Sequence, residues 1–457
     1  MSRIVLDIST LYRWTTRDVG ITRTERMLAQ RLLGRSDSLF VRYDPGALTY
    51  IEVPRSTVED IVHGNALGSS EAIVSGAAIA PTGLKRKARN AAKRVAIRAE
   101  RLIPPPARAD YWAGVRHLRL AASRSLHGPE LDAPSPVQET STLALAELHP
   151  SDVYISVGLD WDSNSYSHLY ALKQRIGFKV LLTCYDLIPV MFPQYIGSEA
   201  AFYGGHFVDL VHTADAVACI SETSRRDLRA FTVREGLPCP PTNVVLLGAD
   251  FASPPPTALE PEPSGEPLLD GDFVVMVGTI EPRKNHRLAF ELWERMVQTR
   301  GQSNVPKLVV VGRRGWRTDD LVLAFSLTRD LADVVVLKHD VSDAELSWLY
   351  EHCLFTILPS LYEGWGLPVV ESIAHGKVCV ASTAPAVVEA GHGVALHIDT
   401  FDQRAWLEAI THLIDDPAAR AVHERAVDTL RTSLPQRLSW DRYSDELLSV
   451  AASLSAD

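Results

Sequence analysis

The strongest constraint on the fold is a pattern of short β-rich runs that alternate with helical segments, repeated in each half of the chain. In the first half, six such runs begin with RIVLDIS (3–9) and end with NVVLLG (243–248). In the second half, six more begin with FVVMVGT (273–279) and end with GVALHID (393–399). Strands that alternate with helices pair in parallel, and the helices form the crossover connections. The sequence therefore predicts an α/β protein built from two Rossmann-like domains.

A proline-rich, acidic stretch separates the two halves. Residues 250–272 (DFASPPPTALEPEPSGEPLLDGD) contain too few apolar side chains for a core, and we interpret them as a linker. The first domain then spans residues 1–249 and the second spans residues 273–435. Residues 436–457 are predicted to form a helix that packs back on the first domain. A length of 457 residues agrees with two domains.

One segment of the first domain has a charge opposite to that of the whole chain. The formal net charge is -10, yet residues 85–124 contain 12 Lys or Arg against two acids, Glu100 and Asp110. We interpret the region near 80–125 as a basic insertion. Its cations either contact anionic membrane lipid or a lipid diphosphate, or they form the solvated face of a helix.

The composition favours a soluble, cytoplasmic enzyme. No apolar run approaches the roughly 20 residues that a membrane-spanning helix needs, and MSRIVLDIST (1–10) lacks the features of a signal peptide. The five cysteines show no CxxC spacing, so neither a zinc site nor a disulfide framework is predicted. We expect no nucleic-acid partner. Peripheral contact with the inner face of the plasma membrane, through residues 85–124, is left open.

The segment PSLYEGWGLPVVESIAHGK (359–377) is predicted to follow a strand, turn through a glycine-rich loop and start a helix. Ligands of doubly wound sheets bind beyond the carboxyl ends of the strands. A helix amino terminus with Gly364 and Gly366 beside it suits a diphosphate. Glu371, one turn inside the helix, and Glu363, before it, can then accept hydrogen bonds from sugar hydroxyls on either side. This pattern predicts a nucleotide-sugar site.

The cations for such a site stand in VGTIEPRKNH (277–286), after the first strand of the same domain. Arg283 and Lys284 would neutralise a diphosphate and stabilise its negative charge as it leaves. An Arg-Lys pair by itself is more often a solvated pair of loop bases. The combination with two nearby glutamates favours the binding role.

These motifs together resemble the donor domain of retaining, family 4 glycosyltransferases of the GT-B architecture. The resemblance is carried by VGTIEPRKN (277–285), VVVGRRGW (309–316), VSDAELSWLY (341–350) and LPSLYEGWGLPVVESIAHGK (358–377). The first half shows weaker similarity in GITRTE (20–25), YDLIPVMFP (185–193) and ACISETSRRDL (218–228). The family's fold implies two domains whose parallel sheets face a central cleft.

The resemblance also implies roles for individual residues. Glu363, Arg283 and Lys284 would be catalytic. We expect no metal, because Arg283, Lys284 and the helix end can replace it, and no cofactor besides the nucleotide-sugar co-substrate. The residues implied to bind the donor are Gly20, Thr279, Gly364, Trp365, Gly366, Leu367 and Glu371. Trp365 either stacks on the donor or packs between loop and helix.

On the acceptor side, the candidates are Asp160, Trp161, Tyr185 and Asp186. Two positions depart from the family pattern. Thr279 stands where many relatives have an arginine, and Tyr185 stands where many have a histidine, whose proton transfer a phenol cannot perform near neutral pH.

We therefore hypothesise a retaining, metal-independent hexosyltransferase. The EPRKN variant (281–285) favours GDP-mannose or a related GDP-deoxyhexose as the donor. The acceptor would be a saccharide or a lipid-diphosphate-linked saccharide in O-antigen or capsule synthesis. Three alternatives stay open: a UDP-hexose donor, a nucleotide-sugar 2-epimerase, and a non-catalytic scaffold subunit.

Overall fold

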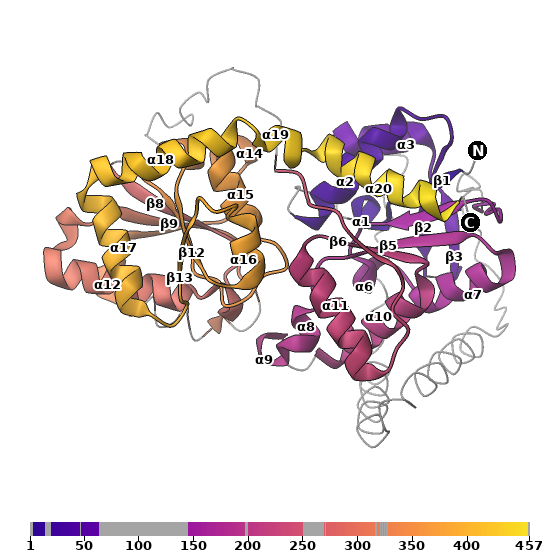
Figure 1. The fold of residues 1–457 in the computed structure, drawn as a ribbon, viewed down its shortest axis with the longest axis horizontal. Helices are drawn as coiled ribbons and strands as arrows, with labels where there is room; N and C mark the ends of the chain where they lie inside the picture. The colour runs from indigo at the N-terminus through magenta and orange to yellow at the C-terminus, as the bar shows by residue number, and fades with distance from the viewer. Residues whose placement is uncertain are drawn as a thin grey trace, which may run out of the picture.

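The two domains lie side by side, each with a sheet wrapped by helices (Figure 1). This computed structural model describes residues 3–13, 20–45, 47–63, 145–196, 200–249, 269, 271–315, 318, 319, 321, 323, 325 and 328–455. Most of the linker predicted at 250–272, and the whole basic segment 85–124, lie outside the described residues.

The first domain contains a seven-stranded sheet with the order β3-β2-β1-β4-β5-β6-β7. Its strands are β1 (Ile4–Asp7), β2 (Ser38–Asp44), β3 (Thr49–Glu52), β4 (Val153–Ser156), β5 (Lys179–Cys184), β6 (Ala216–Cys219) and β7 (Thr242–Val244). All neighbours pair in parallel except β2 and β3. The helices are α1 (Ser9–Arg13), α2 (Ile21–Leu33), α3 (Arg55–His63), α6 (Asp160–Ser163), α7 (Tyr166–Ile176), α8 (Ile188–Met191), α9 (Pro193–Ile196), α10 (Ala200–Thr213) and α11 (Glu222–Glu235).

The second domain contains a six-stranded parallel sheet with the order β10-β9-β8-β11-β12-β13. Its strands are β8 (Phe273–Val277), β9 (Lys307–Val311), β10 (Val335–Lys338), β11 (Thr356–Leu358), β12 (Cys379–Ser382) and β13 (Leu396–Ile398). Its helices are the 3-10 turns η3 (Pro282–Lys284), η4 (Gln302–Asn304) and η5 (Arg329–Leu331), then α12 (His286–Arg300), α14 (Asp343–His352), α15 (Leu367–Ala374), α16 (Pro385–Ala390), α17 (Gln403–Asp415) and α18 (Pro417–Arg431).

Burial on both faces explains why these strands are visible in the sequence. Parallel strands covered by helices on both sides read as continuous apolar runs, and β1 and β12 are buried at every position. Each of the twelve predicted runs overlaps one observed strand, and the predicted α/β class with two Rossmann-like domains is confirmed.

The structure adds one strand that the sequence pattern did not indicate. Residues 49–63 form β3 and α3 and belong to the first domain. β3 turns back from β2 and pairs antiparallel at the sheet edge. A four-residue edge strand carries too short an alternation to stand out from a loop.

The C-terminal helices return from the second domain to the first. α19 (Leu434–Arg437) leads into α20 (Trp440–Leu454), which lies along α2 (Figure 1). Ser439 caps α20 by accepting a hydrogen bond from the backbone N–H of Arg442 at 3.2 Å. Trp440 packs so closely on Gly248 that a Cβ there would lie 2.5 Å from the backbone nitrogen of Trp440. The region 436–455 is therefore part of the first domain's packing.

A carboxylate from the second domain caps a helix of the first. Glu389, in α16, accepts hydrogen bonds from the backbone N–H groups of Glu222 at 2.9 Å and Thr223 at 2.8 Å, and from the Thr223 hydroxyl. These amides are the first two of α11, where helical backbone donors have no partner inside the helix. Glu389 thus ties the two domains through a charge-assisted cap.

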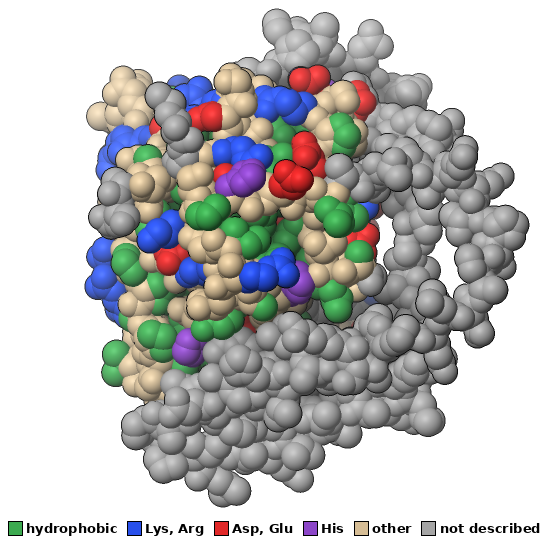
Figure 2. All heavy atoms as spheres, turned by 90° about the vertical axis from the view of Figure 1, so that its right-hand side faces the viewer, with side chains coloured by type: hydrophobic (Ala, Val, Ile, Leu, Met, Phe, Trp, Pro, Cys, Tyr) green, Lys and Arg blue, Asp and Glu red, His purple; other side chains and the backbone are tan. Residues whose placement is uncertain are grey.

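The described part of one face of the first domain carries side chains of mixed type. On the described part of the face in Figure 2, basic, acidic and apolar side chains are interspersed. Among the helices in the described part of the chain, none combines the length and the apolar character required to cross a membrane. The expected contact of residues 85–124 with anionic lipid stays a prediction.

We predict that Glu389→Ala lowers the free energy of unfolding by about 1–2 kcal/mol, because α11 loses its charged cap. Urea unfolding of Glu389→Ala, Thr223→Val and the double variant measures this loss and the coupling between the two residues. Glu59→Ala, which removes an exposed glutamate, is the matched control. A loss no larger than that of the control, with no coupling, would contradict the assigned contact.

Candidate functional site

The candidate site lies where the strand order of the second sheet reverses. β8 and β11 are parallel neighbours at the centre of that sheet. The chain crosses from β8 to β9 on one side of this pair and from β11 to β12 on the other side. The loop after β8 contains η3 with Arg283 and Lys284, and the loop after β11 contains Glu363. The backbone N–H of Leu361 donates to the carbonyl of Arg283 at 2.8 Å and ties the two loops together. Such switch points are where doubly wound sheets bind ligands.

Glu363 and the two basic residues form one buried ion-pair network. Glu363 Oε2 accepts from Arg283 at 2.5 Å, and its Oε1 accepts from Lys284 Nζ at 2.6 Å. Ser360 donates a third hydrogen bond to Oε1 at 2.7 Å. The other arm of the Arg283 guanidinium binds Glu281 Oε1 at 2.5 Å. Two carboxylates and two cations therefore balance their charge in this network.

The network fixes the protonation state of Glu363. Burial alone would raise the pKa of this carboxyl, but Arg283 and Lys284 outweigh it and lower the pKa to about 2. Burial likewise opposes the charge of Arg283, yet Glu363, Glu281 and Asp186 together raise the pKa of Arg283 above its usual value. Glu363 is therefore a carboxylate at neutral pH, held in one orientation by three donors.

Lys284 reaches Glu363 because its side chain passes over Gly278, which has no Cβ to block it. Gly278, with φ of 147°, ends β8, and a Cβ there would lie 3.3 Å from Lys284 Cε. The side chain of Lys284 is mostly buried. The sequence grouped Arg283 and Lys284 as ligands of a diphosphate; the structure shows that both are already engaged with Glu363, so a phosphate would share them with that carboxylate.

Glu371 occupies a separate environment. It is buried in α15, where it accepts from the Tyr350 hydroxyl at 2.8 Å. Burial raises the pKa of Glu371, although Arg23 and Tyr350 oppose this effect. Arg23 belongs to α2 of the first domain and also pairs with Asp343 of the second at 2.7 Å. The two glutamates of the E-x7-E pair are thus held by different partners.

The remaining residues assigned to the donor surround the start of α15. Gly366 precedes the helix with φ of 138°, and Leu367 is its first residue. Thr279 is exposed after β8, and Gly20, with φ of 52°, precedes α2 in the first domain. Trp365 is only 4% exposed and lies edge-on to His392. Its ring packs between loop and helix and offers no face for stacking on a donor.

Gly364 lies in close contact with the first domain. A Cβ at Gly364 would lie 2.6 Å from the carbonyl oxygen of Tyr185 and 2.9 Å from Cβ of Asp186. Its own carbonyl accepts hydrogen bonds from Ser221 at 2.6 Å and Ser224 at 3.1 Å. Only glycine fits here, so this glycine serves the contact between the domains rather than approach to an anion.

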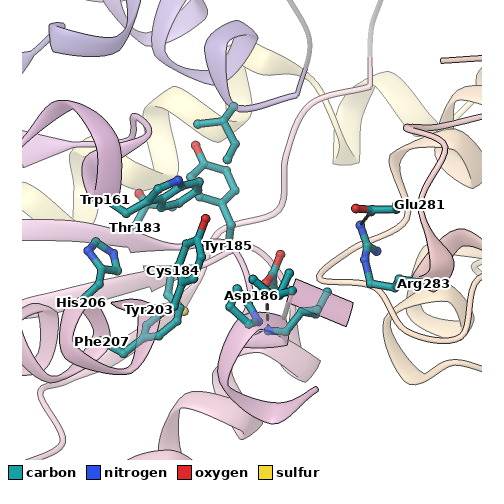
Figure 3. A pocket seen from close by; sticks show the side chains of 14 residues that line it. Trp161, Thr183, Cys184, Tyr185, Asp186, Tyr203, His206, Phe207, Glu281 and Arg283 are labelled. Carbon is teal, nitrogen blue, oxygen red and sulfur yellow. Dashed lines mark hydrogen bonds and ion pairs between the residues drawn. The ribbon is translucent and has the colours of Figure 1, made fainter. Parts of the chain in front are cut away.

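The acceptor-side candidates lie around a cavity of about 200 Å³ between the domains, which Figure 3 shows. Trp161, Tyr185 and Asp186 line it from the first domain. The Tyr185 hydroxyl donates to the Val157 carbonyl at 2.5 Å, and burial raises the pKa of Tyr185 well above its usual value. This phenol stays protonated and cannot act as a general base.

Asp160 does not share the position of Trp161. It is buried beneath the cavity, where it accepts from Ser156 at 2.6 Å and Tyr166 at 2.5 Å. Burial and the nearby Asp7 carboxylate raise the pKa of Asp160 to about 7. Asp160 therefore anchors the start of α6, the helix that contains Trp161, and does not line the cavity.

Sequence reasoning missed several residues that complete the network. Glu281, Ser360, Tyr350 and Arg23 all lie inside or next to motifs that we had quoted, yet no spacing rule indicated which partner each would meet. Glu281 stands two residues before Arg283, and its opposite charge at this short spacing is a sequence signal for their ion pair. Arg23 pairs across the domains with a residue 320 positions away, which local sequence cannot indicate.

The comparisons with known proteins agree with this geometry. A profile of the family described as glycosyl transferases group 1 matches residues 262–428, which contain both loops of the site. The chain is 25% identical over 264 residues to the serotype-specific mannosyltransferase WbdA of Escherichia coli, covering 55% of this chain and 31% of that protein. It is 28% identical over 151 residues to the O-antigen chain mannosyltransferase B of Escherichia coli, covering 33% and 39%.

A third relative has a different acceptor in its name. The chain is 28% identical over 218 residues to the D-inositol 3-phosphate glycosyltransferase of Thermobispora bispora, covering 46% of this chain and 50% of that protein. The matched region thus spans about a third to a half of the length of these three curated relatives.

Solved structures extend the likeness to the whole chain. HepE of Anabaena, in complex with UDP, matches with a TM-score of 0.57 at 15% identity and covers 99% of this chain and 100% of its own. Sucrose-phosphate synthase from Thermosynechococcus elongatus matches with a TM-score of 0.57 at 16% identity and covers 100% of both chains. These likenesses show the fold, and they confirm the expected GT-B architecture.

We predict that the ion pairs of Glu363 stabilise the protein in a pH-dependent manner. A depressed carboxyl pKa contributes stability that is present above the unfolded pKa of about 4.5 and is lost as the pH falls through about 2. At pH 7, Glu363→Gln should cost on the order of 3 kcal/mol, because it leaves Arg283 and Lys284 buried without their full countercharge.

Urea unfolding of the wild type and Glu363→Gln between pH 7 and pH 3 tests this prediction. The gap between the two proteins should narrow below pH 4.5, while Glu59→Gln, an exposed control, should stay close to the wild type throughout. A gap that does not change with pH would show that ionisation of Glu363 does not stabilise the fold.

Proposed function

We propose that this chain, which belongs to the glycosyl transferases group 1 family, moves a hexose from a nucleotide sugar to a saccharide or lipid-linked acceptor with retention of configuration. The observation that carries the proposal is the ionised Glu363, held by Arg283 and Lys284 at the switch point between β8 and β11. A fixed carboxylate beside two cations suits a sugar that is bound at one end to a diphosphate.

The diphosphate has a binding place on the same loops. Pro368 has no N–H and the Val369 N–H donates to the Gly366 carbonyl at 2.9 Å, so the positive end of the α15 dipole, rather than a set of free amides, favours an anion there. Lys284 and Arg283 have further N–H donors beyond those used by Glu363. They would stabilise the charge that builds on the leaving diphosphate, as a catalytic metal does elsewhere.

Glu363 would position the transferred sugar and support positive charge at its anomeric carbon. Its low pKa keeps it from giving a proton, so we assign it no general-acid role. The leaving diphosphate itself would help to deprotonate the acceptor hydroxyl on the face that it leaves, which retains the configuration. Glu371, in α15, would accept hydrogen bonds from the ribose hydroxyls.

The names of the relatives favour mannose as the sugar. Two of the curated relatives are mannosyltransferases, and one of these builds O-antigen chains by its name. We therefore favour GDP-mannose as the donor and a cell-surface polysaccharide as the product. A UDP-hexose is the second candidate, because the structural neighbour HepE also forms a complex with UDP-glucose.

We predict that one nucleotide class stabilises the protein against heat. Thermal shifts with GDP-mannose, GDP-rhamnose, UDP-glucose, UDP-N-acetylglucosamine and dTDP-rhamnose would identify the donor. A ligand present at about 100 times its Kd adds about 2.7 kcal/mol of stability. Glu371→Ala should lose the shift, since it removes the acceptor for the ribose. No shift with any of these donors would favour a scaffold subunit instead.

We predict that Glu363→Gln lowers kcat at least about 100-fold with the donor found above, because it removes charge that stabilises the transition state. Release of nucleoside diphosphate measures the rate, and Glu59→Gln should keep wild-type turnover. Turnover of Glu363→Gln near the wild-type rate would remove Glu363 from the mechanism.

A further inference from the structure

The cavity between the domains has two unlike walls. Its polar wall comes from Glu281 and Arg283 of the second domain, with Asp186 of the first (Figure 3). Its opposite wall comes from α6 and α10 of the first domain and presents Trp161, Tyr203 and Phe207. At about 200 Å³ the cavity is smaller than the roughly 300–1,000 Å³ typical of drug-sized ligands. It suits a single sugar-sized group.

The polar wall offers hydrogen-bond acceptors rather than free positive charge. Arg283 is the one cation that lines this cavity among the described residues, and both of its arms are occupied by carboxylates. Glu363, Glu281 and Asp186 all lie close enough to raise the pKa of Arg283, and Asp186 accepts from the Ile188 N–H at 2.9 Å. An anionic group that entered here would meet Asp186 and Glu281 before it met an uncompensated cation.

The opposite wall adds no charge either. His206 stacks on Tyr166 with 4.8 Å between the ring centroids and lies edge-on to Trp161. Burial lowers the pKa of His206 to about 3, so its ring is neutral at pH 7. With Tyr203 and Phe207, this wall presents aromatic surfaces that suit the apolar face of a pyranose ring.

We infer that the acceptor group entering this cavity is an uncharged sugar, which packs one face on Trp161 and donates hydroxyl hydrogen bonds to Asp186 and Glu281. This inference rests on the proposed function and narrows it. The transfer would then extend a neutral saccharide, and a phosphate or a uronic acid would be a poor acceptor. The chain would differ in this respect from the relative whose name specifies D-inositol 3-phosphate.

Matched acceptors test the charge requirement. With the donor identified by thermal shift, methyl hexopyranosides are compared with the same sugars carrying a 6-phosphate or a 6-carboxylate. Binding is measured by titration calorimetry in the presence of the nucleoside diphosphate, and transfer by product mass. We expect the neutral sugars to bind and to have a kcat/KM at least about tenfold higher than their anionic partners. Equal or better use of the anionic sugars, or binding of none of the neutral ones, would overturn the inference.

Two variants test the aromatic wall and the polar wall of the cavity separately. Trp161→Leu should raise the KM for the neutral acceptor about tenfold, whereas Phe401→Leu, at a ring that is 87% exposed, should leave that KM unchanged. Asp186→Asn keeps the shape of the side chain and removes its charge, so it should narrow the preference for neutral over anionic acceptors. An unchanged preference would overturn the role given to Asp186.

The outcomes distinguish this inference from the proposed function on which it rests. If no nucleotide sugar binds, the proposed function fails and the inference fails with it. If a donor binds and is turned over, but anionic acceptors are preferred, the glycosyltransferase proposal stands and only the inferred acceptor class is wrong.

Discussion

The buried ion pairs of Glu363 with Arg283 and Lys284 are the interaction on which the rest of the site depends. They join the loops that leave β8 and β11, together with the hydrogen bond from the Leu361 N–H to the Arg283 carbonyl. Removing one partner of a buried pair leaves the other charge without compensation, which is far more costly than the net contribution of the intact pair. The cluster therefore makes each of its members difficult to replace, whether the selective pressure is stability or chemistry.

The same loop also determines how the domains meet. The carbonyl of Gly364, next to Glu363, accepts from Ser221 and Ser224, and its Cα lies against Tyr185 and Asp186. Tyr362, on the other side of Glu363, donates to Asp227 of the first domain at 2.6 Å. The residues that would hold the sugar are thus flanked by contacts to the other domain. A change in the separation of the domains would act directly on the position of Glu363.

The sequence predicts features that depend on a local pattern of residues, such as the strands. It does not predict which side chains meet when the segments that carry them lie far apart in the chain. Buried parallel strands are continuous apolar runs, so all strands except the short edge strand β3 could be located. Arg283, Lys284 and Glu363 were recognisable because charged residues at the ends of central strands converge. That both cations bind Glu363, that Tyr350 holds Glu371 and that Trp365 is buried follow from side-chain packing between segments far apart in sequence. No spacing rule encodes those partners.

The return of α20 to the first domain has a mechanical consequence. The polypeptide passes between the domains twice, once through the segment after β7 and once through α19, and Trp440 is locked against Gly248 where the second passage ends. This contact places the point where the chain leaves the first domain beside the point where it returns. Rotation about this point is then the easy motion between the domains, while separation of the domains at this point is resisted. Any opening of the cavity between the domains would then be a rotation about this point, and Glu363 would move with the second domain.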